Sequence, residues 1–175
     1  MTNQKSWEEY RQDVRDFNAT RAEKGWGPVQ PTVVVNAACF DTEAEAWDVM
    51  LRHSVEAQDS VLRHYGWRDA ERFRHTKGYE QYAAFSDIAN TRSVDQIGEH
   101  SARPQAWGTP DQVLEKLEHV QRTTSAEELV LNFRFGGMPV ETAERSMRLF
   151  SSEVLGRLHD LPAPLHPDMD GVPSK

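Results

Sequence analysis

The chain has 175 residues, with 28 acidic side chains and 20 lysines or arginines, which give a formal net charge of -8. This length suits one domain with one core, and an acidic chain without a basic cluster argues against nucleic acid or an anionic membrane as its main partner. No apolar run approaches the roughly 20 residues of a membrane span, and the polar N-terminus lacks the apolar core of a signal peptide. The single cysteine, Cys39, excludes an internal disulfide and fits a reducing compartment, so we expect a cytoplasmic protein.

The first third of the chain predicts a helix, a strand and a second helix. Aromatic and apolar residues three or four positions apart predict an amphipathic helix from Ser6 to about Lys24. The valine run 33–35 is typical of a strand buried on both faces, as in a parallel sheet. Thr42 and Glu45 have the spacing of a capping box, so a helix is expected to begin there and to end near Gly66.

The middle of the chain has a weaker hydrophobic period. Residues 67–107 are therefore expected to form a lid-like insertion, since long irregular segments inside a domain are usually functional lids or disordered. Lys77, Tyr79 and Arg92 are the candidates in this insertion to lie over a substrate. The alternative is a solvated loop.

Regular structure resumes at Gly108. Thr109 as N-cap, Pro110 at the first helical position and Gln112 three residues after the cap predict a helix start. A short apolar run at 129–131 then predicts a second buried strand.

The unit that follows is a strand, a glycine turn and a helix. Phe133 and Phe135 continue the strand, Gly136 and Gly137 end it, and Pro139 opens a helix that is expected to run to about Leu161. In α/β proteins ligands bind in the loops after the carboxyl ends of strands, so this turn is the candidate site. Residues 162–175 are expected to form a disordered tail.

Several stretches resemble, in order and spacing, the C-terminal segment of bacterial-luciferase-like flavin-dependent monooxygenases. These are 108–113, 127–131, 136–139 and 145–150, together with 41–46 after the valine-rich strand. The resemblance covers about residues 7–158. It implies an α/β, helix-rich partial (β/α)8 TIM barrel, with the last two βα units and an insertion, in which residues 1–161 are the C-terminal portion of a luciferase-like domain.

The resemblance also implies the chemistry. Family members use reduced flavin, usually FMN and sometimes a deazaflavin, to activate dioxygen and oxidise a small organic substrate, and a flavin reductase is the implied partner. Cofactor-binding candidates are Phe133 facing the isoalloxazine, Arg134 pairing with an anionic group, and Gly136 and Gly137 before the helix. The alternative is that the phenylalanines are core residues and Arg134 is a solvated charge. No catalytic residue is assigned.

Seven histidines and Cys39 do not form a metal motif. The histidines lack the short-spaced partners of a zinc site and are expected on the surface, whereas Cys39 is expected to be a buried structural thiol. No metal is therefore predicted.

A complete barrel takes about 250 residues and eight strands, whereas this sequence predicts two. Two hypotheses follow. The chain is a luciferase-like monooxygenase or the C-terminal fragment of one, or it is a non-catalytic truncated barrel that acts as an interaction module or needs a partner chain for the missing strands. Because a two-stranded sheet with two apolar faces is marginal alone, a homo-oligomer is also possible.

Overall fold

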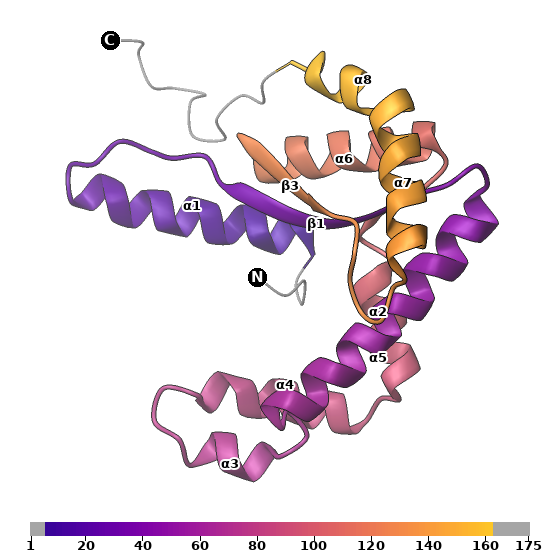
Figure 1. Ribbon diagram of the computed structural model, residues 1–175. Coiled ribbons are helices and arrows are strands. Elements are labelled where there is room, and N and C mark those ends of the chain that lie inside the picture. The colour runs from indigo at the N-terminus through magenta and orange to yellow at the C-terminus, as the bar shows by residue number, and fades with distance from the viewer. Residues whose placement is uncertain (1–5, 163–175) are drawn as a thin grey trace.

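The computed structural model describes residues 6–162, and residues 1–5 and 163–175, which include nearly all of the predicted tail, lie outside that description (Figure 1). The elements follow in the order α1 (Trp7–Glu23), β1 (Thr32–Cys39), α2 (Glu43–Tyr65), α3 (Ala70–Arg74), α4 (Glu80–Asn90), α5 (Val94–Ala102), β2 (Ala106–Gly108), α6 (Pro110–Thr124), β3 (Glu128–Asn132), α7 (Val140–Glu153) and α8 (Leu155–His159). The protein is therefore α/β and helix-rich, as predicted.

The three strands form one parallel sheet in the order β2-β1-β3. β3 pairs with β1 from Thr32↔Glu128 to Asn36↔Asn132, and β2 pairs only with Ala37–Cys39 on the other edge of β1. The sequence predicted two strands, whereas this sheet has three, so the prediction was wrong on this point. The missed strand is β2, whose first two residues fall within the segment assigned to the insertion. A barrel with strands in chain order would place β2 between β1 and β3. The structure therefore shows a small three-stranded parallel sheet rather than a demonstrable part of a barrel.

One face of the sheet is covered by α1, α6, α7 and α8. The alternate β1 residues Val35, Ala37 and Cys39 are fully buried there against Trp7 and Leu117. The rest of this cluster comprises Ala106, Val113, Val120, Phe150 and Val154. This face forms the main core.

The other face is covered only at its carboxyl half. Ala38 and Phe40 pack with Met50 of α2. Val34 and its register partner Val130, by contrast, are 44% and 45% exposed. The expectation that the valine run is buried on both faces was therefore wrong for Val34, because α2 does not extend over the amino half of the strand.

The segment 67–105 is helical rather than irregular. α3, α4 and α5 follow α2, and α3 and α4 lie at its C-terminal end, away from the sheet (Figure 1). α5 crosses α2 so closely that a Cβ on Gly98 would lie 2.5 Å from the Val55 side chain. Leu62, Ala89 and Ile97 form a separate apolar cluster here. We call α3, α4, α5 and the C-terminal half of α2 the arm.

Local signals placed most helix ends correctly. Thr42 caps α2 by accepting a hydrogen bond from the Glu45 N–H, and Gly66 ends α2 in the left-handed conformation. Gln112 accepts a hydrogen bond from the Thr109 N–H at the start of α6. The helix predicted from Pro139 to Leu161 is, however, divided at Val154 into α7 and α8.

Candidate functional site

The loop between β3 and α7 lies directly on α2. Gly136 has φ 58, and a Cβ at this position would lie 2.4 Å from the carbonyl oxygen of His53. Real side chains do not approach a backbone oxygen so closely, and non-glycine residues adopt this φ only at a cost. The glycine predicted to break the strand thus also allows the loop to touch the helix.

A carboxylate from α2 holds the next residue of this loop. Glu56 accepts a hydrogen bond from the Gly137 N–H at 2.9 Å, and the same oxygen lies 2.7 Å from Nδ1 of His53. The bond from His53, followed by that from Gly137, lowers the pKa of Glu56. The backbone donor of Gly137 is therefore already bonded to an anionic group of the chain itself.

The two phenylalanines of the loop are part of the packing. Phe133 lies edge-on to Phe150 with ring centroids 5.2 Å apart, in the main core. Phe135 is 8% exposed and packs with Met138 on the α2 side of the sheet. Phe133 thus belongs to the main core, and Phe135 belongs to the apolar cluster on the α2 face of the sheet.

Arg134 is a predicted site residue that carries a charge and is exposed to solvent. Its Nε donates to the Met138 carbonyl oxygen at 3.2 Å, and its backbone N–H donates to Oδ1 of Asn132 at 3.3 Å. Asn132 in turn donates to Oδ1 of Asn36 at 3.0 Å, across the β1–β3 pair. The backbone of Arg134 is therefore linked to a polar pair at the carboxyl end of the sheet, and its guanidinium group is held against the β3–α7 loop.

The structure does not bring the predicted lid residues to this loop. Lys77 and Tyr79 are exposed between α3 and α4, and Arg92 is exposed after α4, all in the arm. Figure 1 shows α3 and α4 at the end of α2 away from the sheet. Arg134, Gly136 and Gly137 thus lie together, and Lys77, Tyr79 and Arg92 lie elsewhere.

His53 is the site residue that the sequence did not reveal. It was assigned to the surface with the other histidines, but it is only 5% exposed. Its position three residues after buried Met50 and three before Glu56 places it on the inner face of α2. This spacing was the sequence signal that could have indicated a buried histidine.

Cys39 is buried, as predicted. Its N–H donates to Oγ of Ser146 at 2.9 Å, and burial, with smaller contributions from Asp41 and Glu153, raises the pKa of its thiol to about 11. A thiol held protonated in this way is a poor nucleophile. Among residues 6–162, no group of three or more His, Cys, Asp or Glu side chains could hold a metal ion.

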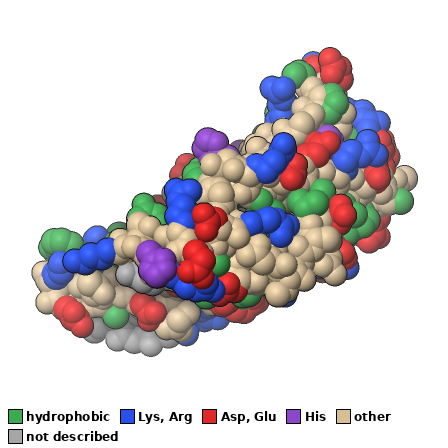
Figure 2. All heavy atoms as spheres, turned by 90° about the horizontal axis from the view of Figure 1, so that it is seen from below, with side chains coloured by type: hydrophobic (Ala, Val, Ile, Leu, Met, Phe, Trp, Pro, Cys, Tyr) green, Lys and Arg blue, Asp and Glu red, His purple; other side chains and the backbone are tan. Residues whose placement is uncertain are grey.

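The surface carries mixed charge. On the face that Figure 2 shows, basic and acidic side chains are interspersed. Within the described part of the chain, no helix is long and apolar enough to cross a membrane.

The fold is similar to that of a solved structure over most of the chain. Monooxygenase RslO1 from Streptomyces bottropensis superposes with a TM-score of 0.55 at 16% sequence identity, over 88% of this chain and 39% of that one. The present chain thus spans about two fifths of that protein. No curated protein sequence matches the present chain.

A family profile identifies the chain more directly. The profile described as luciferase-like monooxygenase matches residues 1–127, which include the whole of α1 to α6 and stop just before β3. The match covers well over half of the sequence, and the solved neighbour is also a monooxygenase. The chain belongs to the luciferase-like monooxygenase family.

Proposed function

We propose that this chain works in a flavin-dependent monooxygenase reaction, in which reduced FMN and dioxygen oxidise a small organic substrate. Family membership over residues 1–127 supports this proposal, because luciferase-like proteins generally use flavin. A flavin reductase would supply the reduced cofactor, and a deazaflavin is the second candidate. The position of the site is inferred from the sheet, since ligands of parallel α/β folds bind at the carboxyl ends of the strands.

The residues at that position do not by themselves fit a bound flavin. Phe133 and Phe135 are held in the core, so their rings are not free to stack on an isoalloxazine. The Gly137 N–H is bonded to Glu56, and that carboxylate would repel a phosphate. Arg134 is the group at this loop that suits an anion. A complete flavin site would therefore need groups beyond those of this loop.

We propose that a complete site forms when further strands cover the open half of the sheet. The exposed pair Val34 and Val130 lies on the face that would point toward such strands, and the polar pair Asn36 and Asn132 follows it toward the carboxyl end. Each large aliphatic side chain left in water forgoes roughly 1.5–3 kcal/mol. The exposed valine pair is the observation that carries this proposal.

An anaerobic titration of reduced FMN tests it. We expect the isolated chain to bind with a dissociation constant of about 0.1 mM or weaker, near -5.5 kcal/mol, and Arg134→Met to weaken binding further. Arg148→Met is the matched control, because Arg148 is an exposed arginine on α7 paired with Glu144. A polypeptide that carries the remaining strands of a luciferase-like barrel should tighten binding.

Two results would change the assignment. A dissociation constant of around a micromolar, about -8 kcal/mol, would mean that the isolated chain holds a complete flavin site. No binding with or without the added strands would favour the alternative function, a non-catalytic truncated member of the family that acts as an interaction module.

A further inference from the structure

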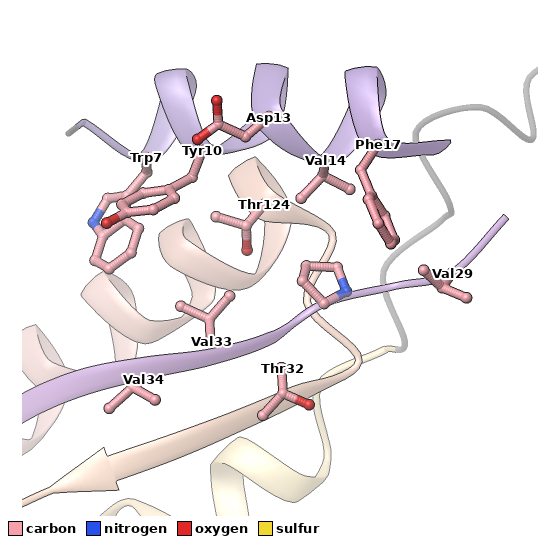
Figure 3. Close-up of a pocket in the computed structure, with 11 residues that line it drawn as sticks. Trp7, Tyr10, Asp13, Val14, Phe17, Val29, Thr32, Val33, Val34 and Thr124 are labelled. Atoms are coloured by element: carbon pink, nitrogen blue, oxygen red, sulfur yellow. The ribbon is translucent and has the colours of Figure 1, made fainter. Parts of the chain in front are cut away.

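A cavity lies between α1 and the amino end of β1. Its volume is about 490 Å³, and α1 contributes Trp7, Tyr10, Val14 and Phe17 to its wall, opposite Val33 (Figure 3). Ligand pockets in proteins are typically roughly 300–1,000 Å³ and mostly apolar. We call this cavity the α1 groove.

The α1 groove is separate from the candidate flavin site. It is formed at the amino end of β1, from Pro31 to Val34, whereas the loop with Arg134 and Gly137 follows the carboxyl end of β3. Because β1 and β3 are parallel, these two places lie at opposite ends of the sheet. A ligand in the groove would not compete with one at the loop.

The groove is open because the sheet is incomplete at this edge. β2 pairs only with Ala37–Cys39, so the amino half of β1 has no strand beside it on that side within residues 6–162. The side-chain amide of Gln105 instead accepts a hydrogen bond from the Asn36 N–H at 2.8 Å. α1 lies along this free stretch and forms the second wall (Figure 3).

Hydrogen bonds hold both ends of α1, so the groove is preformed. Near its start, Trp7 Nε1 donates to the carbonyl oxygen of Pro104 at 3.0 Å. Near its end, the buried Asn18 side chain exchanges two hydrogen bonds of 3.0 Å with the backbone of Val29. A preformed wall lowers the entropy lost when a ligand binds. Without these hydrogen bonds, we would expect α1 to move toward β1 and the apolar walls of the groove to pack against each other.

The charge of the wall selects the ligand. Among the described residues that line the groove, Asp13 is the charged one and none is a lysine or arginine, and the other side chains are mostly apolar. A phosphate or carboxylate would lose its hydration without gaining a cation from these residues, which disfavours a nucleotide-like ligand. We infer that the α1 groove binds a neutral, mostly apolar small organic molecule.

Fluorescence titration with the neutral probe N-phenyl-1-naphthylamine tests this inference on the full chain. We expect saturable binding that Val14→Glu weakens by roughly tenfold or more, because the new carboxylate would lie in an apolar cavity. Val140→Glu is the matched control, since Val140 is 52% exposed at the start of α7, and it should change binding by less than about twofold. Phe17→Glu repeats the test at a side chain that is already 56% exposed and can therefore be changed with little effect on folding.

Two further measurements locate the ligand and test the charge rule. Methyl chemical shifts should change at Val14 and Val33 and not at Met138 beside the other site. The anionic probe 8-anilinonaphthalene-1-sulfonate should bind roughly tenfold or more weakly than the neutral one. Absence of saturable binding, equal affinity for Val14→Glu, or shifts centred on Met138 would each overturn the inference. So would a larger loss for Val130→Glu, which would place the probe on the open sheet face.

Discussion

Glu56 of α2 accepts a hydrogen bond from the N–H of Gly137, 81 positions later in the chain, at 2.9 Å. The same carboxylate oxygen lies 2.7 Å from Nδ1 of His53, so one side chain joins the β3–α7 loop to the inner face of α2. The loop that would border a flavin is thus held in place by residues of this chain.

Glu56→Ala should destabilise the protein by about 1 kcal/mol in urea unfolding at pH 7, an estimate reduced for the 45% exposure of the Glu56 side chain. The pKa of Glu56 is lowered on folding. The ionised Glu56 side chain therefore contributes to the free energy of unfolding above the pKa that it has in the unfolded chain. This contribution is lost as the pH falls through the pKa that it has in the folded protein. The difference between variant and wild type should shrink in acid. Glu144→Ala, which removes an exposed i,i+4 pair on α7, should cost less than about 0.5 kcal/mol.

Gly136→Ala should cost more, because two independent constraints act at this residue. The backbone has φ 58, and the added Cβ would lie 2.4 Å from the His53 oxygen. We expect a loss of about 2–4 kcal/mol in thermal or urea unfolding. The matched control is Gly156→Ala in α8, where an added Cβ meets nothing within 4 Å and should raise stability by about 0.5–1 kcal/mol. Equal effects of the two substitutions would mean that the loop can move off α2.

The sequence predicted the features that depend on neighbouring residues. Thr42 and Gly66 delimit α2 as their types and spacing indicate, because capping is a local interaction. β2 was missed because its three residues become a strand only through pairing with Ala37–Cys39, about 70 positions earlier. The apolar period continues through Val154, so periodicity could not show that the last helix divides there.

The candidate site was only partly predictable for the same reason. The glycines mark the turn by their own conformational freedom. The contact of Gly137 with Glu56 joins distant segments, and the burial of His53 depends on which face of α2 meets the loop. The exposure of Val34 likewise depends on how far α2 extends over the sheet, which three valines in sequence do not determine.

Lys116 should make stability rise with pH. Its Nζ donates to the Trp107 carbonyl oxygen at 2.6 Å and lies 3.2 Å from the centroid of the Trp107 ring. Burial, opposed by Glu43 and Glu115, lowers its pKa from 10.5 to about 8. Between these two values the unfolded chain binds more protons than the folded one, so the free energy of unfolding increases as the pH rises through this window.

Lys116→Met should remove this rise, which we expect to be on the order of 1–2 kcal/mol. Urea unfolding at several pH values between 7.5 and 10 measures it, as the difference between variant and wild type. Lys24→Met, at an exposed position after α1, is the control and should leave the slope unchanged. A wild-type slope that Lys116→Met does not alter would mean that the amine is solvated in solution.

Cys39 should have the opposite pH dependence. Its pKa is raised from 9.0 to about 11, so its contribution to stability is fully present below pH 9 and is lost as the pH rises toward 11. At pH 8, a disulfide reagent such as dithionitrobenzoate should label the native protein on the order of 100-fold more slowly than the urea-unfolded chain. Fast labelling of the native state would show that β1 opens readily. Cys39→Ala is the control that should lose both the labelling and the fall in stability.

The open half of the sheet should make the isolated chain self-associate. Val34 and Val130 are register partners and are 44% and 45% exposed, so their side chains form a continuous apolar strip. Light scattering coupled to size exclusion should therefore detect dimers or larger species whose fraction rises with concentration.

The double variant Val34→Lys/Val130→Lys should be monomeric, because two like charges on the strip oppose the approach of a second copy. Val140→Lys and Met147→Lys, which change exposed apolar residues of α7, should leave the assembly unchanged. A wild-type chain that stays monomeric at high concentration and keeps a sharp near-UV circular dichroism signal would rule out this prediction. It would mean that the valine pair is stable in water, so that its exposure gives no reason to expect further strands over this face.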